Sequence, residues 1–192
     1  ENPRSLAAQA LNRAQKKKLP AAATLASLLK KTSRPQQTTD LTFGTVRNRL
    51  TIDRLITKIA NRPIPHIQPK LLTIIRIGVY ELLYCPDTPE YSIIDQSVNN
   101  TKTIAGQKQA GFVNAVLRNI LRAISNRRIP LETADEKTII PQNLETGCQF
   151  KQPLLPDPQA EPLKYYRAAS SVPEFVTAAW LEDFGAKGSR RI

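Results

Sequence analysis

Two apolar segments that each carry arginine, residues 71–84 and 111–124, place the tightest limit on what this chain can fold into. Apolar side chains recur in both at helical spacing: Leu71, Leu72, Ile75, Val79, Leu82 and Leu83 in the first, and Phe112, Val113, Val116, Leu117, Ile120, Leu121 and Ile124 in the second. Stripes this wide must be buried against other helices. The segments therefore predict a bundle of packed helices, with Arg76 inside the apolar stripe of the first.

The rest of the chain before residue 128 also has a helical pattern. Asn2 and Pro3 are typical of a helix start, and further helices are predicted near residues 21–31, 39–61 and 93–105. Gly44 and the β-branched pair at residues 51–52 indicate that the 39–61 stretch is two shorter helices meeting at a bend. No run alternates apolar and polar residues with a period of two, so we expect no strand. The predicted fold class is all-α, a bundle of about seven helices.

After the bundle the composition changes. Residues 130–162 hold six of the 15 prolines and no helical period, which predicts a proline-rich linker that wraps a surface or is disordered. The segment SVPEFVTAAWLEDFG, residues 171–185, then predicts a short amphipathic helix. We accordingly divide the chain into a helical domain at residues 1–128, a linker at 129–170 and a C-terminal part at 171–192.

The charge of the chain is strongly basic and unevenly spread. The total is +12; residues 1–130 hold 21 basic and 7 acidic side chains, whereas residues 131–192 hold 7 and 9. A basic helical domain attracts polyanions because bound phosphates release counterions, so nucleic acid is the first partner class and an anionic membrane surface the second. No stretch approaches the roughly 18 apolar residues of a membrane span, and the N-terminus lacks a signal-peptide pattern. We expect a cytoplasmic protein with no membrane partner.

The two segments, taken with FGTVRNRLTIDRLI at residues 43–56, resemble the NusB-like all-helical RNA-binding domain. The version to which they are most similar opens the RsmB-type (Fmu/Sun) methyltransferases, which modify carbon five of a cytosine in small-subunit ribosomal RNA. The resemblance covers residues 3 to about 125 and again 171–185. A segment similar to 171–185 introduces the methyltransferase portion of those enzymes, whereas free-standing NusB proteins end earlier. The resemblance implies an RNA-binding domain that guides an enzyme to ribosomal RNA.

Two other functions stay open. The first is a free-standing transcription antitermination factor of the NusB type, acting with a small-subunit ribosomal protein on nascent RNA; the 171–185 segment argues against it. The second is a helical interaction module whose basic face meets an acidic protein. A salt dependence that is the same for RNA and for any polyanion would favour the second.

The resemblance also implies which residues contact RNA. The corresponding positions are Arg4, Gln9 and Arg13 on the first helix, and Lys16, Lys17 and Lys18 extend the same face. Guanidinium groups pair with phosphates and an amide reaches base edges of unpaired RNA, while the alternative is a solvated charged face. A second tier consists of Arg118, Arg122, Arg127 and Arg128, which either oppose the negative end of their helix or extend a phosphate-binding strip.

The chain lacks the residue set for methyl transfer. Methylation at carbon five needs a cysteine thiolate and a glycine-rich turn for S-adenosylmethionine, but the seven glycines do not cluster. Cys85, Cys148 and the lone His66 have no catalytic partners at suggestive spacing, and the two cysteines indicate neither a disulfide framework nor a zinc site. We expect no catalysis, metal or cofactor in this chain, S-adenosylmethionine being implied only for the full-length relative.

Some polar and aromatic side chains are predicted to be structural. Arg49 is expected to pair with Asp53 four residues on, and Arg76 with Asp95 or Glu81, because an unpaired buried guanidinium is strongly unfavourable. Tyr80 and Tyr84, four apart on the most apolar helix, are expected to pack in the core instead of stacking on bases.

Overall fold

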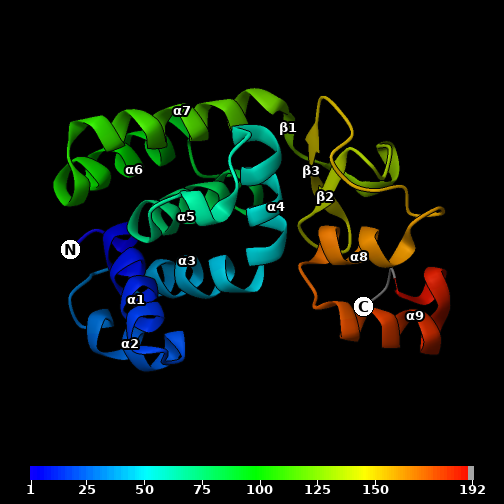
Figure 1. Ribbon diagram of the computed structural model, residues 1–192, viewed down its shortest axis with the longest axis horizontal. Coiled ribbons are helices and arrows are strands. Elements are labelled where there is room, and N and C mark those ends of the chain that lie inside the picture. The colour runs from blue at the N-terminus through cyan, green and yellow to red at the C-terminus, as the bar shows by residue number, and fades with distance from the viewer. Residues whose placement is uncertain (190–192) are drawn as a thin grey trace.

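The structure, a computed structural model, describes residues 1–189, with side chains through residue 185. Its larger part is a bundle of helices (Figure 1). These helices are α1 (Pro3–Lys17), α2 (Ala21–Leu29), α3 (Pro35–Arg47), α4 (Arg49–Ala60), α5 (Pro69–Tyr84), α6 (Glu90–Ala105) and α7 (Gln107–Ala123), with a short 3-10 turn, η1 (Ile64–His66), before α5. The predicted helical bundle is confirmed, and the stretch expected to hold two short helices does so, with the bend at Asn48.

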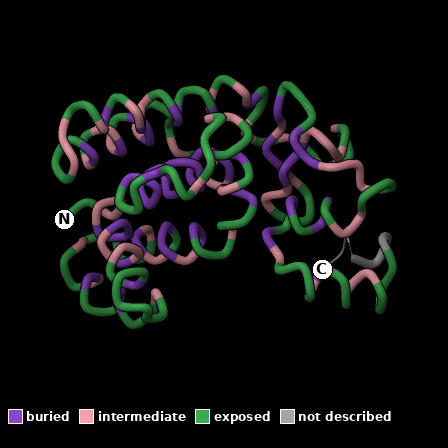
Figure 2. Tube along the Cα trace, viewed as in Figure 1, coloured by how far each residue is buried: buried purple, intermediate pink, exposed green. Residues whose placement is uncertain are grey.

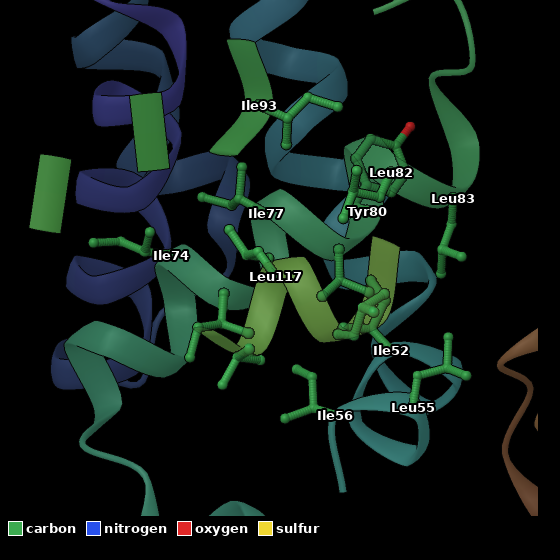
Figure 3. Close-up of a cluster of buried hydrophobic side chains, with 14 of the residues drawn as sticks. Ile52, Leu55, Ile56, Ile74, Ile77, Tyr80, Leu82, Leu83, Ile93 and Leu117 are labelled. Carbon is green, nitrogen blue, oxygen red and sulfur yellow. The ribbon is translucent and has the colours of Figure 1, made fainter. Parts of the chain in front are cut away.

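Helix α5 lies at the centre of the bundle and is buried along almost its whole length (Figure 2). It packs against α1, α3, α4, α6 and α7. Figure 3 shows Ile77 and Leu82 of α5 in a cluster with Ile52 of α4, Ile93 of α6 and Leu117 of α7. Burying one such side chain contributes about 1.5–3 kcal/mol, so a cluster of this size is the main apolar contribution to stability. The predicted apolar stripe is confirmed.

Gly44 marks a close approach of two helices and not the predicted bend. It lies inside α3, and a Cβ atom added there would be 2.1 Å from Cζ of Tyr80. Tyr80 is 7% exposed, stacks on Tyr84 with ring centroids 5.4 Å apart, and donates its hydroxyl to Asp40 at 2.9 Å. The expected core position of Tyr80 and Tyr84 is therefore confirmed, and glycine at position 44 makes room for the Tyr80 ring.

The buried arginine of α5 is held by a carboxylate of α4. Nε and Nη2 of Arg76 donate to the two carboxylate oxygens of Asp53, each at 2.7 Å. The expected internal ion pair of Arg76 is confirmed, but its expected partners, Asp95 and Glu81, are wrong. Asp95 is exposed on α6, and Glu81 pairs with Arg4. The predicted pair of Arg49 with Asp53 is present at 3.6 Å. One carboxylate thus joins two arginines at the α4–α5 contact.

A small sheet follows the bundle, with β1 mostly in the predicted helical domain and the other two strands where the sequence predicts an irregular linker. Its strands are β1 (Ile124–Pro130), β2 (Ile139–Pro141) and β3 (Thr146–Phe150), with a 3-10 turn, η2 (Leu131–Thr133), after β1. β3 is central and antiparallel to both neighbours, with Ile140 opposite Cys148 and Ile129 opposite Gly147. The expectation of no strand is wrong, and the fold is not strictly all-α. β2 and β3, of three and five residues, are too short to show a clear period-two pattern, and the register of β1 with β3 is interrupted twice.

Two helices complete the described chain, α8 (Pro162–Ser170) inside the predicted linker and α9 (Glu174–Ser189). α8 packs on α4: Oγ of Ser171 accepts the N–H of Leu50 at 2.8 Å, and Oγ1 of Thr51 donates to the carbonyl of Ala168 at 2.7 Å. The helix predicted within residues 171–185 is present as α9, but the amphipathic character expected of it is wrong, because Phe175 and Phe184 are 77% and 56% exposed. The division of the chain at residues 128 and 170 stays a prediction, and residues 190–192 of its third part lie outside the described residues.

Candidate nucleic-acid interface

Helix α1 presents one apolar face to the bundle and its cations to solvent. Asn2 begins the helix, as predicted, because its side chain accepts the N–H of Arg4 at 2.9 Å. The face that packs on α2, α3 and α5 consists of Leu6, Ala7, Ala10 and Ala14. Arg13, Lys16, Lys17 and Lys18 are exposed, and in the described part of the chain none of the four forms an ion pair or a side-chain hydrogen bond. These four predicted RNA contacts lie together at the C-terminal half of α1, with their charges available to a ligand.

Arg4, by contrast, is occupied inside the protein. Its Nε and Nη2 donate to the two carboxylate oxygens of Glu81 on α5 at 2.7 and 2.8 Å, and the two side chains are 12% and 1% exposed. Burial raises the pKa of Glu81, and the guanidinium of Arg4 opposes that rise. The geometry gives Arg4 a structural role in fixing α1 on α5. Gln9 is half-buried and donates to Glu1 at 3.4 Å, so its amide lies near the start of α1 and away from the lysines.

Arg127 of the second tier caps the end of α5. It lies on β1 and not on a helix, and its guanidinium donates to backbone carbonyls at 2.6–3.0 Å. Those carbonyls belong to Glu81, Leu82, Cys85 and Thr88. The last carbonyls of a helix have no partner within it, and a cation is favourable at that end. The predicted alternative in which Arg127 opposes the negative end of a helix is confirmed, but the helix is α5 and not its own. Because its guanidinium N–H groups are bonded to these carbonyls, they are not available to phosphate.

The other second-tier arginines are exposed and lie apart from the α1 cations. Arg118 donates to Asn114 at 3.0 Å and Arg122 to Asn119 at 3.1 Å, both along α7. Arg128 pairs with Asp87 at 2.7 Å, with both side chains more than half exposed. In Figure 1, α7 crosses the top of the bundle while α1 lies below α5. The structure therefore does not bring the two predicted tiers into one surface.

Sequence reasoning did not select two exposed cations on α4. Arg54 and Lys58 are one turn apart, and burial, with the Arg54 charge as the second cause, lowers the pKa of Lys58. Lys58 donates to the carbonyls of Pro153 and Leu154 at 3.1 and 3.3 Å. A signal for these two cations was present in the sequence: they are four residues apart, and no carboxylate lies three or four residues from either. Like charges at this spacing destabilise a helix.

The described residues do not offer the thiolate that carbon-five chemistry needs. Burial raises the pKa of Cys85 to about 12, with the charges of Asp40 and Glu81 adding to the effect. Burial also raises the pKa of Cys148 to about 12. A neutral thiol is a poor nucleophile, so both cysteines act as packing groups at neutral pH. No group of three metal-binding side chains, and no helix long and apolar enough for a membrane span, occurs in the described part of the chain.

Comparison with known proteins relates the chain to one family and to two kinds of relative. A model of the NusB family matches residues 1–122. A transcription antitermination protein NusB of Legionella pneumophila (strain Corby) is 36% identical over 72 residues, which are 38% of this chain and 49% of that protein. A probable ribosomal RNA small subunit methyltransferase B of Bacillus subtilis (strain 168) is 23% identical over 154 residues, 80% of this chain and 28% of that protein. The chain thus spans about half, or less, of the length of these curated relatives.

A solved structure shares the fold of the helical part. The chain in a structure titled "Crystal Structure of a Plectonemic RNA Supercoil" superposes with a TM-score of 0.59 at 22% identity, over 63% of this chain and 92% of that one. At this identity the likeness concerns the fold alone. The family match over residues 1–122 covers α1 to α6 and all but the last residue of α7, and so includes the buried α5. The chain belongs to the NusB family.

Proposed function

We propose that this chain is the RNA-binding domain of an RsmB-type methyltransferase of small-subunit ribosomal RNA, and that it guides the enzyme to its substrate. One observation carries the proposal: the similarity to the Bacillus subtilis methyltransferase covers 80% of the chain, whereas that to the Legionella antitermination protein covers 38%. An alignment of 154 residues must extend past residue 122, into the segment that holds the small sheet. The sheet is an integral part of the folded molecule, because it shares the main core through Ile140, Cys148 and Phe150.

RNA binding in this proposal depends on the exposed half of α1. Arg13 and Lys16–Lys18 would contact phosphates, since their charges are exposed and lack a carboxylate partner in the described residues. Gln9 lies nearer the start of α1, and its amide would have to leave Glu1 to reach a base edge. Arg4 is left out of this set because Glu81 holds both of its donors.

The chemistry of methyl transfer lies outside the proposed role of this chain. S-adenosylmethionine and the nucleophilic thiolate would belong to the catalytic portion of the longer relative. The raised pKa of Cys85 and Cys148 supports this assignment, because neither thiol ionises near neutral pH.

Binding to a labelled small-subunit ribosomal RNA hairpin at two salt concentrations tests the proposal. Arg13→Ala and Lys17→Ala should each weaken binding about three- to tenfold and lower the salt slope by about one. Lys70→Ala, which removes an exposed cation at the start of α5, is the matched control and should bind like the parent. Equal affinity for an unrelated hairpin, with no effect of either α1 variant, would overturn the proposal.

The second candidate is antitermination of transcription together with a small-subunit ribosomal protein. The 36% identity to the Legionella protein, higher than that to the methyltransferase, favours it. Formation of a ternary complex of this chain, a small-subunit ribosomal protein and a nascent antitermination RNA would support this function. Preference for the ribosomal RNA hairpin without any ribosomal protein would favour the methyltransferase role.

A further inference from the structure

The groove between α4 and α8 gathers cations that the α1 site does not use. It has a volume of about 450 Å³ and is lined by Leu50, Arg54, Leu163, Lys164, Arg167, Ala168 and Glu174. Three cations thus face one carboxylate, and Lys58 stands one turn beyond Arg54 on α4. A groove with this excess of positive charge concentrates polyanions at its surface.

The cations of the groove are only weakly neutralised by the protein. Lys164 pairs with Glu161, and Arg167 pairs with Glu174 at 2.6 Å, but the four side chains are between 45% and 70% exposed. Exposed pairs of this kind contribute little and exchange readily with another anion. Arg54 forms no ion pair in the described residues, and its charge contributes to lowering the pKa of Lys58. A bound anion would relieve this repulsion.

A second hollow, which shares no lining residue with the groove, lies at the exposed half of α1. Leu50 lines the α4–α8 groove, and its neighbour Arg49 lines this second hollow of about 260 Å³, which it shares with Gln15 and Leu19. Leu19 and Leu50, together with Val46 in the second hollow, are 47%, 37% and 47% exposed. Cations and exposed apolar side chains therefore occur both at the end of α1 and in the α4–α8 groove. Surfaces that bind single strands follow the phosphate backbone with a positively charged groove, which is the part that the cations supply here.

We propose that the α4–α8 groove binds the phosphate backbone of a single-stranded RNA segment that continues from the α1 site. The inference rests on the proposed function and adds a contact region that includes α8, outside the part of the chain matched by the family model. The hydrogen bonds of Ser171 and Thr51 fix α8 on α4. The distance between the cations on the two helices is therefore set before RNA binds. Such preorganisation lowers the entropy cost of binding.

Two labelled probes locate the contact: a small-subunit ribosomal RNA hairpin alone, and the same hairpin with a single-stranded extension. Arg54→Gln/Arg167→Gln should bind the extended probe about tenfold more weakly near 100 mM salt, with the salt slope lowered by about two, and should bind the bare hairpin like the parent. Lys70→Gln/Lys108→Gln removes the same charge at exposed positions elsewhere and is the control. If the two double variants bind the extended probe equally, the inference is wrong.

Lysine acylation followed by mass spectrometry gives an independent readout on the parent protein. The extended RNA should protect Lys164 several-fold while Lys108 stays reactive, and polyglutamate at the same charge concentration should not protect Lys164. Equal protection by polyglutamate would overturn the assignment to RNA and favour an acidic protein as the partner.

The outcomes separate the groove from the proposed function. If the α1 variants lose the hairpin preference and the groove variants bind both probes like the parent, the groove is rejected and the proposed function stands. No hairpin preference in the parent would reject the proposed function itself.

Discussion

The helical body, α1 to α7, and the C-terminal unit, residues 124–189, are held by different kinds of interaction. The body is built around α5, whose apolar side chains supply the centre of the main core. The C-terminal unit adds a few side chains to that core but is attached mainly through side chains that bond to backbone groups: Thr51, Lys58, Arg127, Gln142 and Ser171. Apolar periodicity is written into a sequence, whereas a contact between a side chain and a distant carbonyl leaves no pattern there. The helical body can therefore be predicted from the sequence, whereas the attachment of the C-terminal unit cannot.

The largest expected effect comes from breaking the ion pair that fixes α1 on the body. Arg4→Met leaves the buried Glu81 carboxylate without its partner and should lower the free energy of unfolding by about 3–5 kcal/mol. Adding Glu81→Gln should recover a large part of this loss, because the unpaired charge is then gone. Denaturant unfolding of the single and double variants measures both. Full stability of Arg4→Met together with lost RNA binding would return Arg4 to the list of RNA contacts.

Removing the Arg127 cap of α5 should weaken the attachment of the C-terminal unit to the helical body. Arg127→Met keeps much of the bulk but leaves the carbonyls of Leu82 and Thr88 without a donor among the described residues, so we expect a loss of about 2–3 kcal/mol in the free energy of unfolding. Amide exchange should accelerate in β1 and at the end of α5. Arg128→Met, the neighbouring change at a half-exposed ion pair, is the control and should be close to neutral. Similar losses for the two variants would contradict the capping role.

A smaller effect is expected at the contact between α4 and α8. Ser171→Ala removes the acceptor for the N–H of Leu50, and loss of a helix cap typically costs about 1 kcal/mol. Faster amide exchange at Leu50 and Thr51 would show the loosened end of α4. The adjacent and exposed Ser170→Ala provides the comparison, and equal exchange in both variants would mean that the serine does not hold the joint.

The smallest effect concerns the surface pair of Arg128 and Asp87. The hydrogen bond and charge of Arg128 lower the pKa of Asp87, so the pair stabilises the folded state above the usual pKa of an aspartate. That contribution is lost as the pH falls through the lowered pKa of the folded state. Asp87→Asn should therefore differ slightly from the parent at neutral pH and not at all in strong acid. Urea titrations at the two pH values check the sign, and a difference that grows toward acid would contradict it.

The helices and the core could be predicted from the sequence because local spacing specifies them. The buried face of α5, the pair of helices that meet at Asn48 and the pair of Arg49 with Asp53 followed from spacings of three or four residues. The partners of Arg76 and Arg4 did not follow, since they lie 23 and 77 residues away and several carboxylates were compatible. Within the candidate site, periodicity separated the exposed Arg13 from the buried apolar face of α1. It could not separate Arg13 from Arg4, because both are polar positions of one amphipathic helix.

The cap of α5 also has a consequence for the order in which the molecule is completed during synthesis. α5 is the most buried helix, yet its terminal carbonyls are bonded by Arg127 and by Gln142, whose amide donates to the carbonyl of Leu83. Both residues come after position 122, where the family match ends. A nascent chain emerges from its N-terminus, so every helix of the body leaves the ribosome before the end of its central helix can be closed. The small sheet is in this sense the final step in making the bundle.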